Sequence, residues 1–198
     1  MEHINLTAEV DESPMETNSE SNKSERSSNP CPNDGVLRSN GCAHSSSSSK
    51  KCARVAIIGL GARGLNVLER LSAIYDPNKH DYELDVYLFD PGSSPGQGVH
   101  SSEQNSYLLI NTVACQVTMF GDESVTDYGP LRKGPGFFDW AKQQGYRRMP
   151  NNQYLITTDE TGLELRENDY LPRSILGKYL TWVYDDIIEG LPTDMRVH

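Results

Sequence analysis

The chain has 198 residues and carries 28 Asp and Glu against 18 Lys and Arg, which gives a formal net charge of −10 and an isoelectric point near 4.9. This acidic balance argues against a nucleic-acid partner, because no basic stripe is present to neutralise phosphates. No apolar run reaches the ~18 residues of a membrane-spanning helix, so we expect no membrane partner. The length suits one domain with an added tail.

The first 52 residues differ in composition from the rest of the chain. They contain twelve serines, five of them in succession at 45–49, and few large apolar residues. Such a segment cannot bury enough apolar surface to offset the entropy of ordering it. We therefore expect a disordered tail over residues 1–52, which is either a phosphorylatable regulatory arm or an extension without function. Its many acids and lack of an apolar stretch argue against a targeting segment, so the expected location is cytoplasmic.

The cysteines give no sign of a metal site. They form no C-x-x-C pair and do not cluster with histidines at the spacing of zinc ligands. A disulfide framework is not expected in a cytoplasmic chain. We interpret all four as free thiols: Cys31, Cys42, Cys52 and Cys115.

An ordered domain is expected over residues 53–198. It opens with an apolar strand at 54–58, which leads directly into a G-x-G-x-x-G sequence at 59–64. A helix is predicted over 62–75, and its sheet-facing stripe is Leu65, Leu68, Leu71 and Ile74. A second apolar strand over 83–90 ends in Asp90. This order of strand, glycine motif, helix, strand and acid is typical of a dinucleotide-binding βαβ unit.

The glycines of this motif each have a physical reason. Gly59 permits a tight turn, Gly61 lets the backbone approach a pyrophosphate, and Gly64 allows the helix to pack closely on the strand. The helix that starts at Ala62 presents free N–H groups and the positive end of its dipole to the phosphates. The alternative is a glycine turn in an ordinary α/β protein, which the complete order of elements disfavours.

Asp90 is the candidate ribose ligand. A carboxylate at the end of the second strand can accept hydrogen bonds from a ribose diol. Asp90 follows Gly64 by 26 residues, whereas the usual interval is ~20. A longer polar loop over residues 76–82 accounts for the difference.

The elements after Asp90 are less regular. Turn residues predict a loop over 91–98, and an apolar segment follows at 107–112. A polar stretch over 121–136 precedes a short helix predicted at 137–144, which ends at Gly145. Residues 151–168 are compatible with short strands or with a loop.

The last predicted helix covers residues 172–189. Pro172 suits its first turn, and Gly190 ends it. One face is apolar and consists of Ile175, Leu176, Tyr179, Leu180, Val183 and Ile187. Residues 195–198 look like the start of a third strand. Because a doubly wound sheet needs further strands, we expect this chain to be the N-terminal part of a longer protein.

Four motifs in a fixed order carry a resemblance to a known family. They are the glycine motif, then Gly96-Gln97-Gly98, then Tyr107-Leu108-Leu109-Ile110-Asn111-Thr112, and then Leu171-Pro172-Arg173-Ser174-Ile175-Leu176-Gly177-Lys178-Tyr179-Leu180. In these motifs residues 53–198 resemble the FAD/NAD(P)-binding family that includes nitrosuccinate-forming L-aspartate N-monooxygenases and an FAD-dependent urate hydroxylase. The resemblance implies an α/β, Rossmann-type FAD/NAD(P)-binding domain, incomplete at its C-terminus. It also implies FAD as cofactor and NAD(P)H as reductant in the complete enzyme.

The resemblance further implies roles for particular residues. Those expected to contact the cofactor are Gly59, Gly61, Ala62, Arg63, Gly64, Asp90, Asn111, Thr112 and Arg173. Among them Arg63 adds a charge-assisted contact to phosphate, Arg173 approaches the ribityl chain or phosphates, and Asn111 with Thr112 lies near the flavin. Taken from the residues alone, Arg63 is as well explained as a solvated side chain, Arg173 as a partner of an acid (Asp169 or Asp185), and Asn111 as the cap of a turn.

Three functions remain open at this level. The first is a flavin-dependent oxidoreductase of the N-hydroxylating or a related monooxygenase type, acting on a small molecule such as an amino acid or other amine. The second is a dinucleotide-binding module without catalysis, since no second nucleotide site is visible in the sequence. The third is an interaction protein in which the acidic tail recruits a partner. No side chain is a convincing general base, so the catalytic residues are unknown.

Overall fold

The computed structural model of the protein describes residues 50–124 and 127–198. The expected disordered tail lies outside the described residues up to position 49, and so do Cys31 and Cys42. Strand β1 is Lys51–Ile58, so the first strand begins three residues before the predicted position 54. The first two residues of the strand are not apolar, so the sequence pattern does not show them as strand. In the structure Lys51 and Cys52 pair with Tyr82 and Glu83 of a neighbouring strand.

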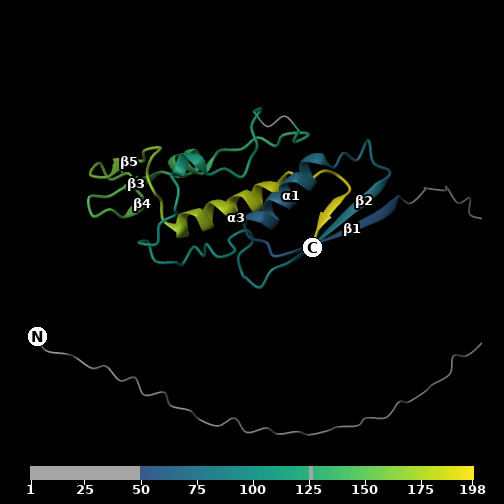
Figure 1. Ribbon diagram of the computed structural model, residues 1–198, viewed down its shortest axis with the longest axis horizontal. Coiled ribbons are helices and arrows are strands. Elements are labelled where there is room, and N and C mark those ends of the chain that lie inside the picture. The colour runs from purple at the N-terminus through teal and green to yellow at the C-terminus, as the bar shows by residue number, and fades with distance from the viewer. Residues whose placement is uncertain (1–49, 125–126) are drawn as a thin grey trace, which may run out of the picture. The chain divides into compact units, whose positions relative to one another are not determined.

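The main sheet has three strands in the order β1-β2-β6, and all of them are parallel (Figure 1). Strand β2 is Tyr82–Phe89 and pairs with all eight residues of β1. Strand β6 is Met195–Val197 and pairs with the middle of β2, as the prediction of a third strand requires. This is the 3-2-1 half of a doubly wound α/β sheet, and the predicted Rossmann-type fold class is confirmed.

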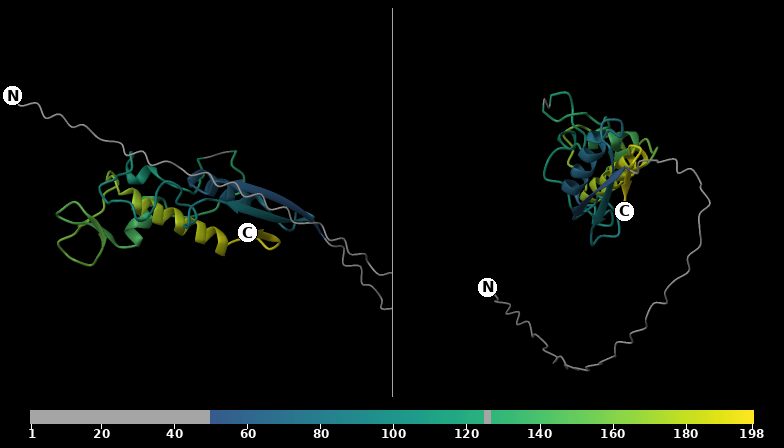
Figure 2. Two further views of the ribbon diagram at one scale, coloured as in Figure 1. Left: turned by 90° about the horizontal axis from the view of Figure 1, so that it is seen from below. Right: turned by 90° about the vertical axis from the view of Figure 1, so that its right-hand side faces the viewer.

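Two helices supply most of the core. Helix α1 is Ala62–Ile74 and α3 is Arg173–Glu189 (Figures 1 and 2). All six residues of the predicted apolar face of α3 are buried. In α1 the prediction is wrong at its end: Ile74 is 50% exposed, and the buried stripe is Leu65, Leu68, Glu69 and Ser72. The buried positions i, i+3, i+4 and i+7 follow one face, and Ile74 lies off that face in the last turn.

The helices share one core with alternate residues of the sheet. Ile57 of β1 and Leu84 and Val86 of β2 are buried with them. The neighbouring positions point the other way, so that Ile58 is 87% exposed and Phe89 is 56% exposed. In the part of the chain that the structure describes, the apolar core therefore lies on one face of the sheet.

A long excursion separates β2 from α3. It contains the 3₁₀ turn η1 (Ala114–Gln116), helix α2 (Phe137–Gln143) and a small antiparallel sheet in the order β4-β3-β5. The strands are β3 (Tyr146–Arg148), β4 (Tyr154–Ile156) and β5 (Leu163–Glu164). The region left open between short strands and loop is thus partly strand. No helix in the two described ranges has the length and apolar character needed to cross a bilayer.

Candidate dinucleotide site

The glycine motif forms the turn from β1 into α1. Gly59 has a positive φ of 89°, and its N–H donates to the carbonyl oxygen of Phe89 at 2.7 Å. A Cβ on Gly64 would stand 2.0 Å from the carbonyl oxygen of Gly59. Only glycine fits there without displacing the turn, which is the close packing expected from the sequence.

The start of α1 is open to an anion. Gly61 is the N-cap, no side chain caps the helix, and its first turn holds no acid. Within the described residues, the N–H groups of Ala62, Arg63 and Gly64 have no acceptor. Free N–H groups and the positive end of the helix dipole favour a phosphate. Arg63 is exposed, and no ion pair engages it in the described ranges. These residues fit the pyrophosphate of a dinucleotide.

Asp90 lies beside this turn. One carboxylate oxygen accepts the Leu60 N–H at 2.6 Å, and the other accepts the Gly92 N–H at 2.8 Å. Both bonds go to backbone, so the carboxylate ties the end of β2 to the glycine turn. Each oxygen keeps a second lone pair. A ribose hydroxyl can therefore be bound without breaking either bond.

A second glycine loop covers the helix start, and its placement was not foreseen. Gly98 has a φ of 53°, and a Cβ on it would lie 2.9 Å from Cα of Gly61. On the other side, a Cβ on Gly177 of α3 would lie 1.8 Å from the carbonyl oxygen of His100. The loop of residues 91–104 is thus packed between the glycine turn and α3. The glycines at 96, 98 and 177 were the available signal, although their contacts join distant parts of the chain.

Gln97 anchors this loop from the inside. Its side chain is 8% exposed, donates to Thr181 Oγ1 at 3.1 Å and accepts the Ser102 N–H at 3.0 Å. Thr181 Oγ1 in turn donates to the carbonyl oxygen of Pro95 at 3.1 Å. Thr181 thereby attaches the residues on either side of Gly96 to α3.

The remaining predicted residues gather at the start of α3. Arg173 donates from its backbone N–H to Leu108 at 2.7 Å and from Nε to the carbonyl oxygen of Leu109 at 3.2 Å. Thr112 donates to Gln116 at 2.8 Å, and Asn111 is exposed. Arg173 thus contacts the segment just before Asn111 and Thr112, and no hydrogen bond within the described residues joins these three to the glycine turn.

The alternative reading of Arg173 as an ion-pair partner is not supported. In the described ranges Asp169 pairs with Arg148 at 3.8 Å and accepts the backbone N–H of Arg166. Arg173 instead lies near His100, and burial together with the positive charge of Arg173 lowers the pKa of that imidazole. His100 is therefore neutral at pH 7, which leaves Arg173 as the positive charge at this end of α3.

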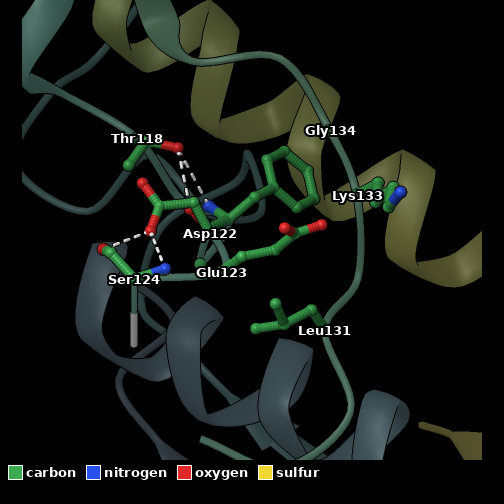
Figure 3. Close-up of a pocket in the computed structure, with 9 residues that line it drawn as sticks. Thr118, Asp122, Glu123, Ser124, Leu131, Lys133 and Gly134 are labelled. Carbon is green, nitrogen blue, oxygen red and sulfur yellow. Dashed lines mark hydrogen bonds between the residues drawn. The ribbon is translucent and has the colours of Figure 1, made fainter. Parts of the chain in front are cut away.

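A separate cavity of about 660 Å³ is lined by residues of the excursion between η1 and α2 (Figure 3). Its walls include Thr118, Glu123, Leu131 and Lys133. Figure 3 shows Asp122 turned toward Ser124, whose backbone N–H it accepts at 2.9 Å. None of the residues predicted to bind the cofactor lines this cavity.

Comparison with known proteins defines the class. The model of the FAD-NAD(P)-binding family matches residues 56–198. That range contains the glycine turn, Asp90, the second loop and α3. The chain therefore belongs to the FAD-NAD(P)-binding family, as the motifs predicted.

Over most of its length the chain is also similar to curated proteins. It is 37% identical over 147 residues to a nitrosuccinic acid synthase of Aspergillus oryzae, an alignment covering 73% of this chain and 20% of that protein. It is 37% identical over 144 residues to a nitrosuccinate-forming L-aspartate N-monooxygenase of Streptomyces davaonensis, covering 72% and 22%. An enzyme of the same name from Streptomyces cremeus is 36% identical over 151 residues, covering 73% and 22%. The chain thus spans about a fifth of the length of these relatives.

Proposed function

We propose that this chain is the FAD-binding portion of a flavin-dependent, NAD(P)H-using N-monooxygenase whose substrate is a small amino acid or related amine. The observation that carries the proposal is the uncapped, glycine-lined start of α1, with Asp90 on one side and Gly98 on the other. Support for the chemistry comes from the relatives, two of which are L-aspartate N-monooxygenases.

The cofactor roles follow from the geometry of the turn. Gly59, Gly61 and Gly64 would hold the pyrophosphate close to the backbone, and the N–H groups of Ala62 and its neighbours would donate to it. Bound FAD would supply the redox and oxygen chemistry, while the protein supplies binding, orientation and exclusion of water.

Charged residues would complete the cofactor contacts. Arg63 would neutralise phosphate charge from the first turn of α1, and Asp90 would accept hydrogen bonds from the adenosine ribose. At the start of α3, Arg173 would provide a second cation, with Asn111 and Thr112 beside it on the flavin side. These three assignments rest on the family motifs and on their shared location.

A dinucleotide-binding protein without catalysis is the second candidate. It is favoured by the single nucleotide-binding motif among the described residues. Within residues 50–124 and 127–198, the glycine turn is the one G-x-G-x-x-G segment. A separate site for NAD(P)H is not evident in that part of the chain.

Steady-state consumption of NADH or NADPH by the FAD-loaded protein separates the two candidates. The proposal expects consumption of one reductant and oxidation of L-aspartate or another small amino acid. FAD binding without consumption of either reductant would favour the non-catalytic candidate. The cytoplasm is the proposed location, which cell fractionation tests directly.

A further inference from the structure

A groove of about 340 Å³ lies between α2, the β3-β4 hairpin and α3. Figure 1 shows these elements gathered around the first half of α3. The residues used below are Gln97, Trp140, Tyr146, Lys178, Trp182 and Asp185. None of the predicted cofactor ligands lines this groove, and it does not overlap the residues of the cavity in Figure 3.

Two polar groups in the wall of the groove lack partners. Trp140 is 4% exposed and Tyr146 is 5% exposed. The indole Nε1 of Trp140 and the hydroxyl of Tyr146 are buried and make no hydrogen bond within the described residues. A buried donor without an acceptor costs about 1–3 kcal/mol. Both residues line the groove, so a ligand in it can satisfy these donors once the side chains turn toward it.

Opposite charges stand along the same groove. Lys178 and Asp185 are seven residues apart on α3, which places them two turns apart, about 10 Å along the helix. Both are exposed, and neither forms an ion pair in the described ranges. Trp182 lies between them on the same face and stacks with Tyr179. The groove therefore offers a cation, an aromatic surface and an anion in sequence.

We propose that this groove binds a small α-amino acid as its zwitterion. Its carboxylate would pair with Lys178 and accept hydrogen bonds from Trp140 and Tyr146, and its ammonium would pair with Asp185 over the aromatic surface. The inference rests on the proposed function in one respect, because it takes this amino acid to be the substrate.

Gln97 connects the groove with the cofactor site. Its side chain lines the groove, while the next residue, Gly98, touches Gly61 at the start of α1. The loop that closes over the glycine turn therefore also forms one wall of the groove. An amino acid bound here contacts the same short segment that a bound cofactor contacts.

The two tryptophans of the chain are Trp140 and Trp182, and both line this groove. Indole N–H signals in ¹H–¹⁵N spectra therefore report on it alone, and Trp→Phe variants assign them. The probe is L-aspartate, with succinate and propylamine as analogues that lack the ammonium and the carboxylate. We expect saturable shifts of both indole signals with L-aspartate and at least tenfold weaker binding of either analogue.

Matched charge variants test the mode of binding. Lys178→Gln and Asp185→Asn should each weaken L-aspartate binding about tenfold or more, because each removes one charged hydrogen bond. Lys142→Gln and Glu189→Gln remove the same charges at exposed positions outside the groove and should leave the affinity unchanged. Equal binding of succinate or propylamine, or equal losses in the control pair, would overturn the zwitterion assignment.

FAD uptake by the same sample keeps the two proposals distinguishable. Bound FAD with no indole shift at millimolar L-aspartate would overturn this inference and leave the proposed function standing. Saturable indole shifts without FAD uptake would support the amino-acid site and contradict the proposed function.

Discussion

Two glycines only three residues apart have opposite structural requirements. A Cβ on Gly64 would meet the carbonyl oxygen of Gly59 at 2.0 Å, so the turn must move to admit it. A Cβ on Gly61 would meet only Cα of Gly98 at 3.5 Å, an ordinary contact, and its φ of −80° suits any residue. The fold therefore requires glycine at position 64 but not at position 61. A requirement for glycine at position 61 would come from a bound ligand.

The stability of alanine variants checks this distinction. Gly64→Ala should lower the free energy of unfolding by about 1–3 kcal/mol or more, because it overpacks a backbone contact. Gly61→Ala should cost less than about 1 kcal/mol, the scale of an unfavourable N-cap. Urea denaturation measures both, and equal losses would show that the turn does not distinguish the two sites.

Asp85 is the most strongly held carboxylate of the sheet. It is 7% exposed and accepts hydrogen bonds from Arg196 Nε at 2.8 Å and Cys52 Sγ at 3.1 Å, with His198 Nε2 at 3.3 Å. These partners, Arg196 first, hold the pKa of Asp85 well below its ordinary value of 3.8. The carboxylate therefore stays charged in the folded chain at a pH where it is protonated in the unfolded chain.

The resulting pH dependence has a defined sign. A lowered pKa contributes stability above pH 3.8, and that contribution is lost as the pH falls below this value. Thermal unfolding between pH 7 and pH 3 should show a steeper fall in Tm for the wild type than for Asp85→Asn. The variant should also be less stable at pH 7. Parallel curves would contradict the role given to this network.

At the scale of elements, α3 and the second glycine loop depend on one contact. Gly177 lies in the first half of α3, where alanine would ordinarily stabilise a helix by about 1 kcal/mol. Here a Cβ would meet the carbonyl oxygen of His100 at 1.8 Å. The loop must then move away from α3, and Gly98 with it from Gly61.

Gly177→Ala should therefore lower stability by about 1–3 kcal/mol in spite of the better helix former. It should also weaken FAD binding, because the loop no longer covers the glycine turn. Ser174→Ala, one turn earlier in α3, is the matched control and should change neither. Calorimetry and FAD titration measure the two effects, and an increase in stability for Gly177→Ala would contradict the observed packing.

Arg70 joins α1 to the segment that follows position 127. Glu69 is 1% exposed and pairs with Arg70, whose guanidinium also donates to the carbonyl oxygens of Tyr128 at 3.0 Å and Pro130 at 2.9 Å. The same guanidinium lies 4.4 Å from the centre of the Tyr128 ring. Arg70 therefore both neutralises a buried acid and holds a loop.

Arg70→Met should destabilise the protein by about 3–5 kcal/mol, because it leaves Glu69 buried without a counter-charge. Adding Glu69→Leu should recover a large part of that loss, since an apolar pair avoids the buried charge. A double-mutant cycle by denaturant unfolding measures the coupling. Additive losses would show that the two side chains act independently.

The sequence predicts best what is local in the chain. The helical period of α3 placed all six face residues correctly, and the order of strand, turn and strand predicted β1 and β2. Ile74 was misplaced because a spacing pattern does not show where the helix leaves the core. The contacts of Gly98 with Gly61 and of His100 with Gly177 join positions 37 and 77 residues apart. No local pattern specifies such contacts. The sequence therefore predicts the second glycine loop as a motif, but not its position over the start of α1.

For the whole molecule, the arrangement of its parallel strands decides where a cofactor can lie. The carboxyl ends of β1 and β2 meet at one edge of the sheet, next to the start of α1. Helix α3 leads into β6, and β6 is parallel to β2. The start of α3 therefore also lies toward that edge. Ligands of open α/β sheets bind outside the carboxyl ends of the strands. The two clusters of predicted cofactor residues therefore share one edge, although no hydrogen bond within the described residues joins them.

Titration of the protein with FAD tests most directly whether the glycine turn binds this cofactor. Visible absorption and flavin fluorescence should show saturable uptake by the wild type, and Gly61→Ala should reduce the affinity at least tenfold while losing less than about 1 kcal/mol of stability. Loss of binding in a stable variant would place the cofactor at the backbone of Gly61. A folded wild type that takes up no FAD, or a Gly61→Ala variant that binds it equally well, would contradict the account.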